Sequence, residues 1–309
     1  MNSTRVEIVE VGPRDGLQSE AEVLPTERKV EFVRRLVAAG LRRIEVASFV
    51  NPKRVPQMAD AEAVLSALGN PAGNRFIGLV LNRKGFDRAR AARCTEVGMA
   101  IAASESFGQR NQGLSIDAGI AAWLEIAAAA RDAGIRAQIT ISTAFGCPFE
   151  GEVPVAKVRE IAERLAAGSP DEIAVADTIG VAVPTQVTEV IGALRSALPQ
   201  VRLRAHFHNT RNTGLANAYA AVEAGVHTLD ASCGGIGGCP FAPAATGNIP
   251  TEDLVYMLQR MGIDTGIDLP ALLDTSRWLE GVLEHSVPGM VVKAGLFPKK
   301  AVPKNMENA

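Results

Sequence analysis

The 309-residue sequence predicts an α/β fold, a closed (β/α)8 TIM barrel with additional C-terminal helices. Short β-rich runs alternate with longer helical patterns, and eight such units follow one another at a spacing of about 30 residues. Alternating units predict a parallel sheet covered by helices, and eight of them match the size of a closed barrel. The alternative is an open doubly wound sheet, which the absence of a Gly-x-Gly-x-x-Gly motif after the first run disfavours.

The expected strands are the β-rich runs at residues 6–12, 42–49, 75–81, 97–104, 136–143, 172–180, 202–209 and 227–235. Helical patterns lie between them, and the first places Val30, Val33, Leu36 and Val37 on one apolar stripe. Gly40 follows this pattern and is typical of a helix end, where glycine adopts the left-handed conformation without strain. We expect one domain over residues 1–309, with the barrel over about 5–262 and extra helices over about 270–295.

Composition and charge exclude several classes of partner. The formal net charge is −2, so no basic face for nucleic acid is expected. No apolar run reaches the roughly 18 residues of a membrane span, and the first ten residues lack an apolar signal core. We therefore expect a cytoplasmic protein without a membrane partner. The four cysteines include no Cys-x-x-Cys pair, and no disulfide is expected.

Chemistry in such a barrel lies at the C-terminal ends of the strands, and polar residues gather there. Arg14, Asp15 and Gln18 follow the first strand in Gly-Pro-Arg-Asp-Gly-Leu-Gln. Arg14 is either a salt-bridge partner of Asp15 or a group that stabilises an oxyanion. Glu45 in the second strand and Asp177 at the end of the sixth are either functional carboxylates or structural ones, which cap a helix or pair with an arginine.

A His-x-His pair in the seventh strand predicts a metal site. His206 and His208 are two residues apart, so both imidazoles face the same way and can meet one ion. The alternative is a hydrogen-bonded polar pair at the barrel rim. Asp15 and Asn248 can complete a six-coordinate Mg²⁺ or Mn²⁺ site with two open positions, whereas Zn²⁺ usually prefers four nitrogen or sulfur ligands. Asp230 in the eighth strand is interpreted as structural.

The segment Cys-Gly-Gly-Ile-Gly-Gly-Cys-Pro-Phe-Ala-Pro-Ala-Ala-Thr-Gly-Asn, residues 233–248, allows several interpretations. Glycine-rich turns after late barrel strands bind phosphate, but the spacing here is not that of a phosphate loop. The glycines can instead serve as hinges of a lid that carries Cys239, whose thiol can donate or accept a proton. A third interpretation is an inert thiol in a flexible loop.

Several motifs together resemble those of the 3-hydroxy-3-methylglutaryl-CoA lyase family, which belongs to the metal-dependent aldolase and carboligase barrels. They are GPRDGLQ, IEVASFVNPKRVPQMAD, ASESFGQRN, GCPFEG, ADTIG, HFHNT and GGIGGCPFAPAATGN. They lie at most strand ends in the expected order, and the resemblance extends from about residue 5 to residue 262. It implies a (β/α)8 barrel and a carbon–carbon lyase that acts on an acyl-CoA thioester.

The resemblance also implies roles for individual positions. The metal ligands would be Asp15, His206, His208 and Asn248. The catalytic residues would be Arg14 at the enolate, Cys239 in proton transfer, Glu45 and Asp177 in support of the metal site and catalysis, and His206 as a further acid or base. The reaction would be a retro-Claisen cleavage to acetyl-CoA and a keto acid, acetoacetate for the methylglutaryl substrate. A homo-oligomer is expected, a dimer by analogy with similar barrels.

The chain departs from the family pattern at residues 209–213, where Asn-Thr-Arg-Asn-Thr stands in place of Asp-Thr-Tyr-Gly-Gln. Asn209 removes a charge that could orient a metal-bound histidine. Arg211 adds a cation that meets a substrate carboxylate or a CoA phosphate, or is solvated. Gln18 and Arg211 are candidate substrate-binding residues, and a different branched 3-hydroxyacyl-CoA is an alternative substrate. Two less favoured functions are a Claisen-condensing synthase of the same superfamily and a barrel that binds a CoA ester without turning it over.

Overall fold

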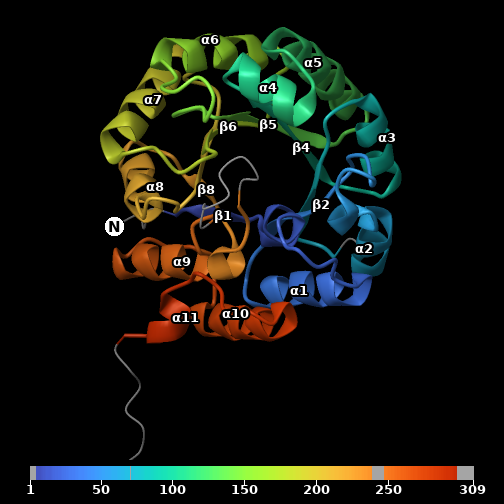
Figure 1. Cartoon of the computed structure of the whole chain (residues 1–309), viewed down its shortest axis with the longest axis vertical. Coiled ribbons are helices and arrows are strands. Elements are labelled where there is room, and N and C mark those ends of the chain that lie inside the picture. The colour runs from blue at the N-terminus through green and yellow to red at the C-terminus, as the bar shows by residue number, and fades with distance from the viewer. Residues whose placement is uncertain (1–4, 70, 239–246, 298–309) are drawn as a thin grey trace, which may run out of the picture.

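A computed structural model of the chain describes residues 5–69, 71–238 and 247–297. Eight parallel strands form a closed barrel in sequence order, and a ring of helices surrounds them (Figure 1). The strands are β1 (Glu7–Glu10), β2 (Arg43–Ser48), β3 (Arg75–Leu79), β4 (Glu96–Ala102), β5 (Arg136–Ser142), β6 (Glu172–Asp177), β7 (Leu203–Phe207) and β8 (Thr228–Ala231). The predicted (β/α)8 barrel is confirmed, and the open doubly wound sheet is wrong.

The barrel closes where β1 pairs with β8, from Glu7 opposite Thr228 to Glu10 opposite Ala231. Every residue of β2, β6 and β8 is buried, as expected for strands that pack against side chains inside the barrel and against helices outside it. Each observed strand lies at a predicted run, but all eight end earlier than predicted. The last residues of those runs belong to the loops that build the site.

The surrounding helices are α1 (Thr26–Ala38), α2 (Ala61–Leu68), α3 (Arg83–Ala91), α4 (Glu105–Gln112), α5 (Ile116–Asp132), α6 (Val155–Ala166), α7 (Pro184–Ala197), α8 (Gly214–Glu223) and α9 (Thr251–Arg260). Three short turns are η1 (Gly12–Gly16), η2 (Pro56–Met58) and η3 (Cys233–Gly235). The predicted apolar stripe of α1 is observed: Val30, Val33 and Leu36 are buried and Val37 is partly buried, while the charged residues other than Lys29 are at least partly exposed. Lys29 is buried and pairs with Asp60.

Two helices follow the eight units, as predicted. Figure 1 shows α10 (Leu269–Leu283) and α11 (Val291–Ala294) outside the ring, next to α1 and α9. Trp278 of α10 packs on Phe32 of α1, with ring centroids 6.0 Å apart, and the Arg35 guanidinium lies 4.8 Å from the Trp278 ring. In the described ranges no single helix is long and apolar enough to cross a bilayer; α4 and α5 pass such a test only together, as a pair bent by 61°.

Candidate active site

The turn η1 places Arg14 and Asp15 at the C-terminal end of β1. The backbone N–H groups of Arg14, Asp15 and Gly16 all point to the Val11 carbonyl, at 3.1, 2.7 and 3.3 Å, which gives one π-helical turn. Such turns often occur at functional sites because they bend the chain sharply. Gly12 permits this turn: a Cβ there would lie 2.6 Å from Glu10 Oε1.

Asp15, His206 and His208 form a cluster that could hold a metal ion. One ligand atom from each lies within 4.8 Å of the others, and the two imidazole centroids are 5.2 Å apart. His206 belongs to β7, whereas His208 lies just beyond its end. The predicted convergence of the two histidines with the carboxylate after β1 is therefore observed, because closure at β8 brings the ends of β1 and β7 together.

Asn248 joins this cluster through backbone pairing with the chain that follows β7. His208 and Asn248 form an isolated antiparallel bridge, and the Asn209 N–H donates to the Gly247 carbonyl at 2.8 Å. The Asn248 amide Nδ2 donates to Asp15 Oδ2 at 2.9 Å. Gly237 lies against the same group, and a Cβ there would be 2.6 Å from Asn248 Nδ2.

Two buried polar atoms of the cluster have no hydrogen-bond partner among the described residues, namely His208 Nδ1 and Asn248 Oδ1. Buried polar groups are rarely left without a partner. A carboxylate, two imidazoles and an amide oxygen are an oxygen and nitrogen donor set that suits a divalent ion. The residues therefore fit the metal that the sequence predicts.

The protonation of two of the three clustered residues, Asp15 and His208, also favours a cation. Burial opposes ionisation of Asp15, but the charges of Arg14 and then of the two histidines lower its pKa to about 2. Burial lowers the pKa of His208 to about 4, helped by the neighbouring His206. The Asp15 carboxylate and the His208 imidazole are thus in the forms that bind metals at neutral pH.

Arg14 is fixed between two carboxylates. Its Nε and Nη2 donate to Glu45 at 2.8 and 3.1 Å, and its Nη1 donates to Asp15 Oδ1 at 2.7 Å. Burial acts against the charge of Arg14, yet Glu45 and Asp15 raise its pKa. Glu45 therefore pairs with an arginine, which was one of the two structural roles considered for it, the other being a helix cap. This pair lies inside the site. Arginine has five N–H donors, so N–H groups remain for a ligand.

Asp177 shapes the loop after β6. Its two carboxylate oxygens accept the backbone N–H groups of Val181 and Ala182, at 2.9 and 3.0 Å. Burial raises the pKa of Asp177, although these hydrogen bonds, His206 and Arg211 act in the opposite direction. Asp177 therefore has a structural role in this loop. Its charge also interacts with that of His206.

Arg211 reaches across to the same loop. Its Nη1 donates to the carbonyls of Ile179 and Gly180, at 3.1 and 2.9 Å. Arg211 is exposed, but its guanidinium is held near the end of β6 by these two carbonyls. Asn209 accepts the Gly214 N–H at 3.1 Å, at the start of α8. Asn209 thus stabilises its own loop, and no hydrogen bond between its side chain and a histidine is found in the described part of the chain.

Two further predicted residues remain, Gln18 and Cys239. Gln18 follows η1, and its buried Oε1 has no hydrogen-bond partner in residues 5–69, 71–238 and 247–297. Cys239 lies outside the described residues. Among the cysteines that the structure describes, Cys94, Cys147 and Cys233 are buried free thiols, as predicted.

One contact at the site was not predicted from the sequence. Asp230, interpreted as structural, lies opposite His206 in the β7–β8 register, and its Oδ2 is 3.2 Å from His206 Nδ1. Burial lowers the pKa of His206, but Asp230 and, after it, Asp15 raise this pKa, and the net shift is upward. The sequence did contain a signal for this contact, namely an acidic residue in the strand next to the His-x-His strand. The pairing register of β7 and β8 is needed to know which histidine the acidic residue faces.

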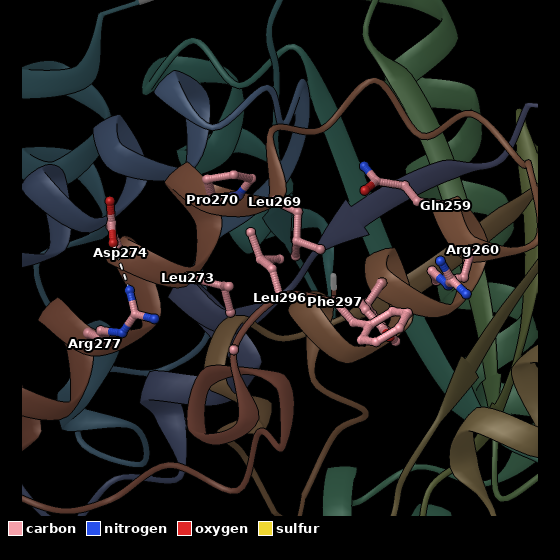
Figure 2. A pocket seen from close by; sticks show the side chains of 11 residues that line it. Gln259, Arg260, Leu269, Pro270, Leu273, Asp274, Arg277, Leu296 and Phe297 are labelled. Atoms are coloured by element: carbon pink, nitrogen blue, oxygen red, sulfur yellow. Dashed lines mark hydrogen bonds and ion pairs between the residues drawn. The ribbon is translucent and has the colours of Figure 1, made fainter. Parts of the chain in front are cut away.

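A groove on the outer helices lies away from the strand ends. This groove, of about 630 Å³, lies between α9, α10 and residues 295–297. Figure 2 shows the side chains that line it. Its lining is largely apolar, with the Asp274–Arg277 pair at 2.8 Å on one side and Arg260 over Phe297 on the other. No candidate site residue lines this groove.

A closed barrel with a carboxylate, an amide and two imidazoles at its strand ends defines a class, the metal-binding barrel enzymes. The family model described as HMGL-like matches residues 5–279. The chain belongs to this HMGL-like family, whose members are metal-dependent, and the predicted resemblance is confirmed.

Named relatives agree with this family. The chain is 44% identical over 305 residues to "(R)-citramalyl-CoA lyase" of Chloroflexus aurantiacus, covering 95% of this chain and 96% of that one. It is 42% identical over 290 residues to the mitochondrial hydroxymethylglutaryl-CoA lyase of Bos taurus, covering 94% and 89%. An HMG-CoA lyase structure from "Acenitobacter baumannii", in complex with coenzyme A and 3-methylmalate, has a TM-score of 0.92 at 38% identity, covering 98% and 99%. The expected carbon–carbon lyase is thus confirmed.

Proposed function

We propose that this chain is an Mg²⁺- or Mn²⁺-dependent lyase that cleaves a branched 3-hydroxyacyl-CoA thioester into acetyl-CoA and a keto acid. The first candidate substrate is 3-hydroxy-3-methylglutaryl-CoA. The observation that carries the proposal is the cluster of Asp15, His206 and His208 beside the Arg14 guanidinium. The cluster would hold a divalent ion, and Arg14 provides a fixed positive charge beside it at the same strand ends.

The residues that would hold the ion are Asp15, His206, His208 and Asn248. A bound divalent ion would polarise the substrate's tertiary hydroxyl and lower its pKa. Asn248 Nδ2 holds the Asp15 carboxylate, and Asp230 fixes the His206 ring through Nδ1. Because Nδ1 of His206 is used in this way, its Nε2 is the nitrogen available to a ligand.

The reaction requires one proton to leave and another to arrive. A base takes the hydroxyl proton, the bond between the α and β carbons breaks, and its electron pair moves onto the thioester as an enolate. Asp177 is the candidate acceptor at the strand ends, because both ring nitrogens of His206 would be engaged, Nδ1 by Asp230 and Nε2 by the ion. Arg14 holds the enolate oxygen, Cys239 or water returns a proton to the α carbon, and acetyl-CoA and the keto acid leave.

The 44% identical citramalyl-CoA lyase supports a second candidate substrate, a citramalyl-type thioester. Its free carboxylate is attached directly to the hydroxyl-bearing carbon, whereas a methylene separates the two in the methylglutaryl thioester. We propose that Arg211, held on the loop after β6, and Gln18, through its amide N–H groups, select between such carboxylates. A condensing synthase stays less favoured, because the named relatives are lyases.

The test is acetyl-CoA release by the purified protein with Mg²⁺, from the two thioesters in parallel. Release with acetoacetate from the methylglutaryl ester supports the first substrate, and release with pyruvate from the citramalyl ester supports the second. No acetyl-CoA from either ester or from a panel of other branched 3-hydroxyacyl-CoA esters would contradict the proposed reaction.

We further propose that the chain acts in the cytoplasm as a homo-oligomer, a dimer by analogy with similar barrels. A relative named cytoplasmic HMG-CoA lyase, 39% identical, supports the compartment. Light scattering after size-exclusion chromatography tests the oligomer, and a monomeric mass at all concentrations would contradict it.

A further inference from the structure

A buried ionic network lies beneath the metal cluster inside the barrel. Its members are Arg43, Glu96, Glu172, Arg204 and Asp230, each no more than 4% exposed. TIM-barrel interiors are usually filled by bulky branched apolar side chains, and buried charges carry a desolvation penalty. An extended ionic network in this position therefore calls for a reason beyond packing.

The network crosses the barrel from the starts of the strands to their ends. Arg43, Glu96 and Glu172 are the first residues of β2, β4 and β6, and Arg43 lies 2.5 Å from Glu96 and 2.9 Å from Glu172. Arg204 lies 3.8 Å from Glu172 and 3.3 Å from Asp230. Asp230 is the last link, because its other oxygen reaches His206.

The two oxygens of Asp230 have different partners. Oδ2 lies 3.2 Å from His206 Nδ1, while Oδ1 lies 3.3 Å from Arg204 Nε. The second contact is an ion pair without hydrogen-bond geometry, since neither atom has a hydrogen-bond partner in the described chain. Arg204 is itself held, because its Nη2 donates to Thr140 Oγ1 at 3.2 Å.

We infer that Arg204 is a positioning residue, whose charge holds Asp230 so that the carboxylate keeps His206 protonated at Nδ1 and leaves Nε2 for the metal ion. This inference rests on the metal site of the proposed function. Residues two apart on a strand face the same side, so Arg204 lies directly below His206. Hydrogen-bond partners of metal-bound histidines commonly change metal affinity about 10–100-fold.

The first test measures Mn²⁺ binding to the metal-stripped full chain. The electron paramagnetic resonance signal of free Mn²⁺ is used to monitor the titration. We expect Arg204→Met to raise the dissociation constant about tenfold. Arg204→Lys restores a cation and should recover most of the affinity. The control is Arg43→Met, which removes an equally buried arginine that pairs with Glu7, Glu96 and Glu172. Its charge acts on Asp230 only from a distance, without an ion pair, so this variant should lose clearly less affinity than Arg204→Met.

The second readout needs no metal. Long-range ¹H–¹⁵N spectra in alkaline buffer report which ring nitrogen of each histidine carries the proton, and the chain has only four histidines. We expect His206 of the wild type to be protonated at Nδ1, with this tautomer depleted in Arg204→Met and retained in Arg43→Met. If the wild-type chain binds no Mn²⁺, the proposed metal site fails, and the spectra still decide the role of Arg204.

The inference can still be tested if the Arg204→Met variant does not fold. If Arg204→Met does not fold, Arg204→Met combined with Glu172→Gln removes one positive and one negative charge and should show the same loss of Mn²⁺ affinity. Unchanged affinity and an unchanged His206 tautomer in the folded variant would overturn the inference. Equal losses in Arg43→Met and Arg204→Met would also overturn it, because the effect would then be general destabilisation.

Discussion

Arg14 is the residue on which the electrostatics of the site depend most. It lowers the pKa of Asp15, and Glu45 holds its guanidinium through two hydrogen bonds. In the reaction that we propose, such a preorganised charge would stabilise the developing enolate without rearrangement.

Replacing Arg14 should therefore affect turnover more than substrate binding. We expect Arg14→Gln to lower kcat about 10²–10³-fold with a smaller change in KM, as measured by steady-state acetyl-CoA release. Arg83→Gln is the matched control, because Arg83 is an exposed arginine paired with Asp87. A raised KM with unchanged kcat would assign Arg14 to binding alone.

Arg211 is the residue that we expect to affect substrate choice. Its guanidinium lies on the carbonyls of residues 179 and 180, away from the hydrogen bonds of the metal cluster. Arg211→Tyr should change the ratio of kcat/KM for the two thioesters by about tenfold or more while Mn²⁺ affinity stays nearly constant. A large loss of Mn²⁺ binding with an unchanged ratio is the opposite result, and it would exclude this role.

At the scale of elements, buried carboxylates hold the turn η3 that follows β8. Glu10 of β1 accepts the Cys233 N–H at 2.8 Å, and Glu252 of α9 accepts the Gly234 N–H at 3.0 Å. Burial raises the pKa of Glu10 to about 7 and that of Glu252 to about 8. The turn that begins the glycine-rich segment is thus held by groups that titrate near neutrality.

These raised pKa values predict a pH-dependent stability. The folded chain keeps a proton on Glu252 that the unfolded chain releases above about pH 4.5, so the free energy of unfolding falls as pH rises from there to about 8. Glu252→Gln should remove roughly 1–3 kcal/mol of this fall, since one pKa unit is worth about 1.4 kcal/mol. Urea unfolding across this pH range measures the fall, with the exposed Glu189→Gln as control. An identical slope in Glu252→Gln and wild type would show that Glu252 does not titrate in this window.

The sequence predicts the elements well and their contacts poorly. Each β-rich run yields a strand at the predicted place, because alternation with helices and local propensity determine where strands form. The contact of His206 with Asp230 depends on the β7–β8 register, and that of Asn248 with His208 on a bridge between loops. Neither follows from local sequence. Arg204 was missed for the same reason, since its ion pairs involve β6 and β8.

At the scale of the whole molecule, we propose that residues 1–309 form one domain in which the C-terminal helices share the core of the barrel. Leu272 of α10 is fully buried, and Cys233 Sγ of η3 lies 3.2 Å from Ser276 Oγ of α10. The helices therefore support the turn next to the site.

Leu272→Ala should lower the free energy of unfolding by about 2–5 kcal/mol in a single cooperative urea transition. The half-exposed Leu124→Ala on α5 should change it far less. Two separate transitions, with the barrel midpoint unchanged, would mean that α10 folds independently.

The most direct test of the central claim is acetyl-CoA release from the two branched thioesters before and after metal removal. The purified chain is dialysed against EDTA, assayed, and assayed again after Mg²⁺ or Mn²⁺ is added. We predict that EDTA abolishes cleavage, that either ion restores it, and that circular dichroism shows an unchanged fold throughout, because the cluster of Asp15, His206 and His208 lies at the strand ends and not in the packed core. Full cleavage activity in excess EDTA would contradict the metal-dependent mechanism.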